Sequence, residues 1–318
     1  MKRYIVIFLA LLSTLFAQKL IQPTYIYKLS NGLATDMIVQ KEKLYISTDT
    51  GKVDIFNATN HKRVQTISLS KIKDFMGDKI DSKIFAIDTM ANKLLILSQD
   101  NGGYSRIHIF KNNTLNAVLT GKDKLNIIKA KFINKETILL GLISNDIISY
   151  NVKTHKRNWT RQASMSKFSS FDLNNDKSMV AVADESGDVH LLATKDGSLI
   201  QKFTGQNVDN IFSIAFQGDI ILTGGQDRRA AIYNIKNKSA YYKQSHFFIY
   251  GVGLSPEGKI GAYSSDINNN ITLFYTQTRE NIATYKATNM IVNSIYFTTK
   301  NKFYVVSNSK DVCYYETK

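Results

Sequence analysis

The sequence contains very little cysteine and proline. One cysteine and two prolines occur among its 318 residues. A single cysteine cannot form an internal disulfide, a zinc site built on cysteines or a CxxCH haem attachment, which excludes a disulfide scaffold, a cytochrome and an iron–sulfur protein. Proline is scarce in chains built from paired strands, because it has no N–H to donate to a neighbouring strand.

Long apolar runs are also missing beyond the N-terminus, since no later stretch approaches the ~20 apolar residues that cross a bilayer. The first residues are Met1-Lys2-Arg3, followed by an apolar run at 5–12 that continues through 13–16 and ends at the small residue Ala17. This pattern predicts a signal peptide at 1–17 and a periplasmic protein at 18–318, with no stable membrane insertion after cleavage. A retained anchor and a buried N-terminal strand are the alternatives.

Acidic residues are outnumbered, with 26 Asp and Glu against 41 Lys and Arg and a net charge of +15. Without Lys2 and Arg3 the charge is +13. Export argues against nucleic acid as a partner, and most of the basic residues are lysines, which lack the bidentate fork of arginine. The positive charge therefore has two possible explanations. It either serves the binding of a protein partner in the cell envelope, or it reflects a general richness of the chain in lysine and asparagine.

A repeated pattern runs through the chain. Seven segments each have a short apolar strand, a polar hairpin and a second strand that ends in a bulky residue. The final residues are Phe56, Phe110, Tyr150, Leu192, Tyr233, Phe274 and Tyr315. The successive intervals between them are 54, 40, 42, 41, 41 and 41 positions. Further strands precede and follow these segments, so a full repeat has four strands in ~40 residues, as in a propeller blade. The sequence predicts an all-β fold, a single seven-bladed propeller.

The two ends of the chain together provide the four strands of one blade. The seventh repeat stops at Lys318 after its third strand, whereas residues 24–29 form a strand-like stretch without a blade of their own. Pairing of this stretch with the last blade would remove an open edge. We therefore expect an N-terminal strand to complete the last blade and close the ring.

Residues 223–234 carry a resemblance to a known family. Their sequence, TGGQDRRAAIYN, resembles the SGSxDxxVxxWD segment of WD40-type propellers, with Tyr233-Asn234 in place of Trp-Asp. Phe56-Asn57 and Tyr150-Asn151 repeat the substitution. The Gly-His pair of the family is missing, so its Asp–His–Ser–Trp hydrogen-bond network is not expected to form.

Among exported propellers, the chain resembles the NapL-type accessory protein of periplasmic nitrate reductases in its signal peptide, size, Lys- and Asn-rich composition and degenerate repeats. This resemblance implies a non-catalytic scaffold that binds a nitrate reductase component and assists its maturation or electron supply. A quinoprotein-like propeller enzyme and a cell-envelope assembly factor are the alternatives. Both of these families tend to have eight blades, whereas the chain has seven repeats. Quinoprotein propellers also have a docking tryptophan in each blade, whereas the chain has a single tryptophan, Trp159.

Residues that could carry chemistry are few. None of the five histidines forms an HxH or HxxxH pair, and no GxSxG, phosphate-binding or dinucleotide motif occurs. We therefore expect no enzymatic activity, cofactor or metal. His61 and His155 lie in matching hairpins and are expected to be solvated, and Cys313 is expected to be a buried strand residue. An aspartate recurs in the hairpins between second and third strands, where tight turns favour it.

Two segments are candidates for binding a partner. The first interval between repeats is longer than the others, which places an insertion of ~13 residues within 70–82. Phe75 and Met76 lie there among charges, and they either meet a partner or pack on the neighbouring blade. The candidate contact residues, on a protein expected to be a monomer, are Lys71, Lys73, Phe75, Met76 and Lys79 in the insertion, with Asp227, Arg228 and Arg229.

Overall fold

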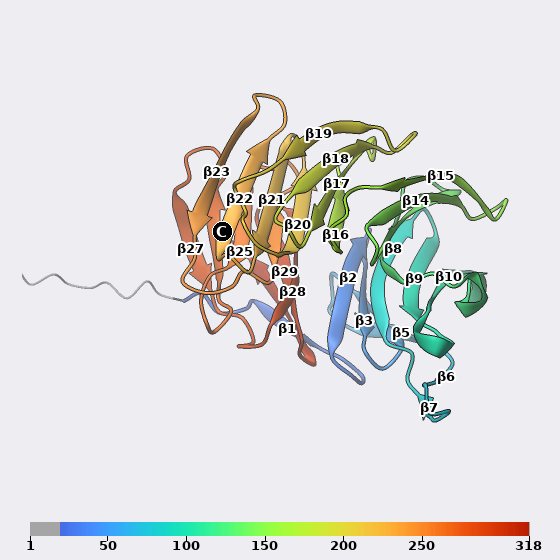
Figure 1. Cartoon of the computed structure of the whole chain (residues 1–318). Helices are drawn as coiled ribbons and strands as arrows, with labels where there is room; N and C mark the ends of the chain where they lie inside the picture. The colour runs from blue at the N-terminus through green and yellow to red at the C-terminus, as the bar shows by residue number, and fades with distance from the viewer. Residues whose placement is uncertain (1–19, 318) are drawn as a thin grey trace, which may run out of the picture.

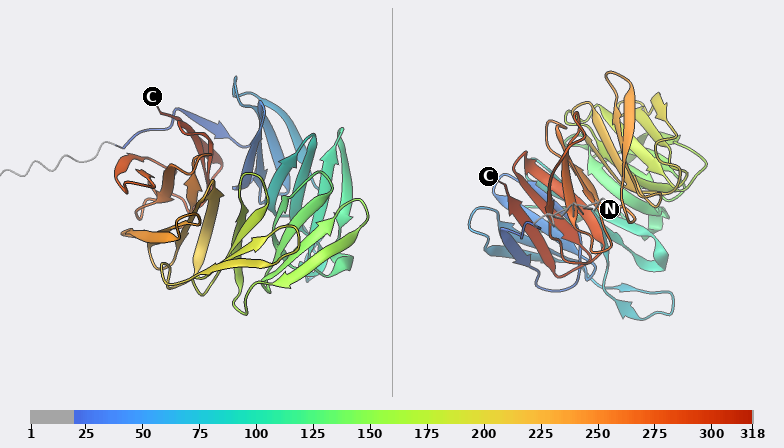
Figure 2. Two further views of the ribbon diagram at one scale, coloured as in Figure 1. Left: turned by 90° about the horizontal axis from the view of Figure 1, so that it is seen from above. Right: turned by 90° about the vertical axis from the view of Figure 1, so that its left-hand side faces the viewer.

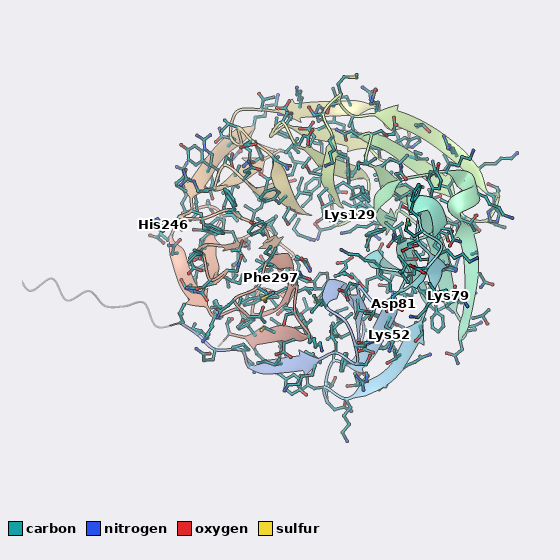
Figure 3. The ribbon with its side chains drawn as sticks, turned by 60° about the horizontal axis from the view of Figure 1, so that its bottom comes forward. Lys52, Lys79, Asp81, Lys129, His246 and Phe297 are labelled. Carbon is teal, nitrogen blue, oxygen red and sulfur yellow. The ribbon has the colours of Figure 1, made fainter. Side chains whose placement is uncertain are left out.

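The computed structural model describes residues 20–317 and shows seven four-stranded antiparallel sheets arranged in a ring (Figure 1). Each sheet forms one blade, with its first strand towards the centre (Figure 3). The predicted seven-bladed β-propeller is therefore confirmed. The predicted signal peptide at 1–17 lies outside the described residues.

Six blades use four consecutive strands. In chain order, these blades are β2 (Ala34–Gln40), β3 (Lys43–Thr48), β4 (Lys52–Asn57) and β5 (Arg63–Ser68); β8 (Ile84–Met90), β9 (Lys93–Gln99), β10 (Ser105–Lys111) and β11 (Thr114–Leu119); β12 (Ile127–Phe132), β13 (Thr137–Leu142), β14 (Asp146–Asn151) and β15 (Lys156–Gln162); β16 (Phe168–Leu173), β17 (Met179–Asp184), β18 (Val189–Ala193) and β19 (Leu199–Phe203); β20 (Ile211–Gln217), β21 (Ile220–Gly225), β22 (Arg229–Asn234) and β23 (Ser239–Gln244); and β24 (Val252–Leu254), β25 (Ile260–Ser264), β26 (Ile271–Tyr275) and β27 (Asn281–Tyr285).

Blade 7 combines the two ends of the chain. Its strands are β28 (Val292–Thr299), β29 (Lys302–Ser307), β30 (Asp311–Glu316) and, outermost, β1 (Tyr25–Lys28). Outside the blades, the chain forms a small hairpin of β6 (Ile72–Lys73) and β7 (Lys79–Ile80) and two short 3₁₀ turns, η1 (Asn101–Gly103) and η2 (Gly121–Asp123).

The position of a strand within its blade follows from its sequence. Middle strands have neighbouring blades on both faces, so they are almost continuously apolar; in β9, for example, residues 94–97 are buried. Outermost strands are polar, as in β15, where only Trp159 is partly covered. Six of the seven bulky residues that end the third strands are buried, and Phe110 is half-buried. The packing between blades is thus the core of the protein.

Closure of the ring by the N-terminal strand is confirmed. β1 pairs with β30, with Tyr25 opposite Tyr314 and Lys28 opposite Asp311 (Figure 2). Further hydrogen bonds continue the pairing at both ends, since Thr24 N donates to the Tyr314 carbonyl at 2.8 Å and Leu29 N to the Lys310 carbonyl at 3.0 Å. The first described residues therefore complete the last blade.

The same N-terminal segment also joins neighbouring blades. Ile21 N donates to the Thr284 carbonyl of blade 6 at 3.0 Å. On the other side, the Tyr27 hydroxyl forms a 2.5 Å hydrogen bond with His61 Nδ1 of blade 1, and the Tyr25 ring stacks on the His61 ring at 4.2 Å. The expectation of a solvated His61 was wrong, because β1 covers that hairpin, whereas His155 is exposed as expected.

Candidate protein-interaction face

The loops of the propeller emerge at two ends of the ring. Because adjacent strands are antiparallel, the loops from second to third strands and the loops between blades lie at one end. We call this end the insertion face, because it contains residues 70–82. The loops from first to second strands and from third to fourth strands form the opposite face.

Exposed apolar side chains are unevenly divided between these faces. Among residues 20–317, seventeen large apolar side chains are exposed, and nine of them are on strands or the β-bridge of Ile21. The remaining eight are on loops of the insertion face: Phe75, Met76, Ile143, Met165, Val208, Ile267, Met290 and Ile291. Within the described chain, no loop of the opposite face contributes an exposed large apolar side chain. Apolar groups gathered on one face are typical of an interaction surface.

The predicted insertion forms a hairpin that projects from the ring between blades 1 and 2 (Figures 1 and 2). At its tip, Phe75 is 97% exposed and Met76 is 83% exposed, so neither packs on the neighbouring blade. The turn is nevertheless ordered, since the Asp74 carboxylate accepts hydrogen bonds from Met76 N and Asp78 N, both at 2.9 Å. Gly77, with φ +93°, supplies a conformation that other residues rarely adopt.

The base of the hairpin is fixed to the ring. Ile72 is buried, and the backbone N–H of Lys73 donates to Asn101 Oδ1 at 2.6 Å. Arg106 donates to the Ser70 carbonyl at 2.7 Å. The Nζ of Lys71 lies 3.3 Å from Asp81. Because the base is fixed by these contacts, the two apolar residues at the tip have a defined position relative to the ring.

The side chain of Lys79 faces a hollow of about 600 Å³ beside the hairpin, together with Lys73 and Gly102. All five candidate residues of the insertion therefore lie on one small projection, as the sequence indicated. Both lysine side chains are exposed there, next to the apolar tip.

The second predicted group, Asp227, Arg228 and Arg229, lies on the same face but across the ring. Figure 3 shows this separation, with His246 beside that group and Lys79 on the hairpin at opposite sides. The structure does not bring the two groups together. A partner that contacts both must span the face.

The carboxylate of Asp227 stabilises the loop that precedes blade 5. It accepts hydrogen bonds from Val208 N at 2.8 Å and from Asn207 Nδ2 at 3.2 Å, and Thr223 donates to Asn207 Oδ1 at 2.5 Å. Asn207, on the loop between blades 4 and 5, therefore both donates and accepts hydrogen bonds in this cluster, as a side-chain amide can.

Blade 4 contains a related arrangement around Asp184. Ser164 donates to its carboxylate at 2.6 Å, and Nε2 of His190 lies 3.4 Å away. Burial acts to raise the pKa of Asp184, but the contacts with His190, Ser164 and Ser186 outweigh it and lower the pKa to about 2. Asp184 and Asp227 thus serve turn and loop structure, as expected of the aspartates in these hairpins.

The central channel contains charged side chains that the sequence analysis did not single out. Asp36, Asp88 and Asp172 stand on first strands, and each accepts a backbone hydrogen bond from the next blade. The donors are Ile87 N, Phe132 N and Phe216 N, at 3.0, 2.7 and 3.0 Å. A single acidic residue in a first strand that has no other charge was the signal that could have revealed them.

Lysines balance these carboxylates. Lys131 Nζ lies 2.5 Å from Asp172, and Lys177 Nζ lies 3.9 Å from Asp88. Burial acts to lower the pKa of Lys131, but Asp172 and Asp88 outweigh it and raise the pKa above its ordinary value. For Lys129, which points to the middle of the ring in Figure 3, burial lowers the pKa. These charges hold neighbouring blades together around the channel.

No family model matches the chain, and no curated protein matches it. Within residues 20–317, no group of three or more His, Cys, Asp or Glu side chains is arranged to hold a metal ion. In that same part of the chain, no helix is long and apolar enough to cross a membrane.

Proposed function

We propose that this propeller is a non-catalytic scaffold that binds a protein partner through its insertion face. The observation that carries the proposal is the gathering of all eight exposed apolar loop residues on that face. Large apolar side chains surrounded by polar loops form the energetically important centres of protein interfaces.

The proposed location is the periplasm, on the basis of the signal-peptide pattern at 1–17. The proposed partner is a component of a periplasmic nitrate reductase, whose maturation or electron supply the propeller would assist, as the resemblance to NapL-type proteins suggests. The seven-bladed ring favours this assignment over a quinoprotein-like enzyme or an envelope assembly factor, since both of those families tend to have eight blades.

The hairpin tip gives a direct test. Replacement of Phe75 and Met76 by serine is expected to weaken binding to purified periplasmic nitrate reductase by at least about tenfold, because a buried apolar anchor contributes 1 kcal/mol or more to such an interface, with about 1.4 kcal/mol per factor of ten. The measurement is the dissociation constant by surface plasmon resonance. Ile200→Ser is the matched control, because Ile200 is exposed on the outermost strand β19 rather than on the insertion face.

Binding of the parent protein with no change in the hairpin variant would exclude the hairpin as a contact. No binding of the parent protein to any nitrate reductase component would contradict the proposed partner.

A further inference from the structure

Four aromatic side chains gather on the insertion face at blades 5 and 6. Phe247, Phe248 and Tyr250 belong to the loop from β23 to β24, and Phe212 belongs to β20. The rings of Phe212 and Tyr250 stack at 5.3 Å, and those of Phe247 and Phe248 lie 5.1 Å apart. We call these four residues the aromatic patch.

The aromatic patch is held in place but not covered. All four side chains are half-buried, whereas Ile249, in the middle of the same loop, is fully buried beneath Gly224. The Ile249 backbone N–H also donates to the Gly225 carbonyl at 3.1 Å. Rigid aromatic rings lose little conformational entropy on binding, so a fixed and partly open group of them is well suited to hold a ligand.

A hollow of about 750 Å³ adjoins the patch, and Phe248 lines it together with Val208, Arg228 and His246. This volume accommodates a few side chains, which is the size of a short peptide segment. Val208 is 60% exposed and adds to the apolar surface. A second hollow, of about 220 Å³, lies on the other side of the patch and is lined by Phe212.

The charged groups of the larger hollow are unequally engaged. Asp227 accepts several hydrogen bonds from the loop, and Asp209 accepts one from Asn210 N at 2.8 Å. Arg229 donates to the Gln206 carbonyl at 3.0 Å and lies over the Tyr242 ring at 4.3 Å. The guanidinium of Arg228, in contrast, is exposed and has no partner within the described part of the chain.

We propose that the aromatic patch and Arg228 form a docking site for an extended segment of the protein partner that carries a large apolar side chain next to a carboxylate. The apolar side chain packs on Phe248, and the carboxylate accepts hydrogen bonds from the planar guanidinium fork of Arg228. The net charge of +13 without the predicted signal peptide favours the approach of acidic segments. This inference rests on the proposed function, because it specifies the chemistry that the insertion face recognises.

Labelled synthetic peptides test the proposal. The first probe has phenylalanine between two glutamates, the second has lysines in place of the glutamates, and the third has glycine in place of the phenylalanine. Fluorescence anisotropy with the purified full chain at low salt is expected to show binding of the first probe, with the other two at least about tenfold weaker.

Two variants and one control identify the site. Arg228→Glu and Phe248→Ser are each expected to lower the affinity for the first probe by about tenfold or more. Arg228→Glu should also raise the affinity for the lysine probe. Lys195→Glu on the opposite face makes the same change in net charge and should leave affinity within about twofold. Thermal melts of all three variants establish that they are folded.

Failure to bind the first probe at millimolar protein concentration would overturn the docking site, as would equal effects of Arg228→Glu and Lys195→Glu. The proposed function would survive either result if the partner still contacts other residues of the insertion face. Contact of the partner with the opposite face would instead contradict the proposed function itself.

Discussion

Removal of residues 19–29 is expected to lower the melting temperature by at least about 10 °C, far more than an N-terminal truncation normally does. The deletion exposes the edge of β30 and removes Tyr27, which is 1% exposed. Burial of one such side chain stabilises the fold by about 2 kcal/mol, and each backbone hydrogen bond of β1 adds about 1 kcal/mol. The loss is therefore comparable to the total stability of many domains.

Two further measurements make this prediction specific. A synthetic peptide of residues 20–29 added to the truncated protein should raise the melting temperature in a concentration-dependent way, because it binds only the folded ring. Within the full chain, Tyr27→Ala should cost several kcal/mol, whereas Ile26→Ala on the exposed side of the same strand should cost about 1 kcal/mol or less. An unchanged melting temperature after the deletion would refute closure by β1.

Asp172→Asn is expected to lower the free energy of unfolding by about 3 kcal/mol or more, because it leaves Lys131 in the channel without the carboxylate that lies 2.5 Å from it. Asparagine keeps one acceptor oxygen for the backbone N–H of Phe216, but its amide nitrogen cannot accept the hydrogen bonds that the other oxygen receives from Leu173 N and Lys131. Replacing both partners of a buried ion pair costs much less than removing one. The double variant Lys131→Met/Asp172→Asn should accordingly be more stable than Asp172→Asn alone.

Chemical denaturation with two-state analysis gives the required free energies. Asp196→Asn is the control, because Asp196 makes an exposed ion pair with Lys195 and asparagine keeps the single oxygen that accepts hydrogen bonds from Ser198. This variant should change stability by no more than about 0.5 kcal/mol. A cost of Asp172→Asn as small as that of the control would show that the channel charges do not hold the blades together.

Much of the fold follows from local sequence. The bulky residues that end the third strands recur every ~41 positions, and this period alone predicted seven blades. The position of β1 followed from counting, since one repeat lacked a fourth strand and one strand lacked a blade. The exposure of Phe75 and Met76 at the hairpin tip could not be predicted from the sequence. Whether two apolar residues on a loop pack on a blade or project into solvent depends on how long the hairpin is and how its base is anchored.

Contacts between distant segments were beyond local patterns. His61 resembled His155 in its hairpin, but only His61 is covered, because β1 reaches it from the other end of the ring. Asn207 joins Asp227 and Thr223 across the loop between blades 4 and 5, and no local pattern in the sequence identifies that contact. The aromatic patch joins an irregular loop of residues 245–251 with a strand of the preceding blade, so its members come together only in the folded ring.

Photo-crosslinking in living cells tests whether the partner binds the insertion face, with benzoylphenylalanine introduced at single loop positions on both faces and the crosslinked products resolved on gels. The positions are Ile143, Met165, Ile267 and Met290 on the insertion face, and Lys135, Lys195, Lys236 and Lys300 on the opposite face. We expect a discrete crosslinked partner from positions of the insertion face only, whereas crosslinks mainly from the opposite face, or equally from both, would contradict binding through the insertion face.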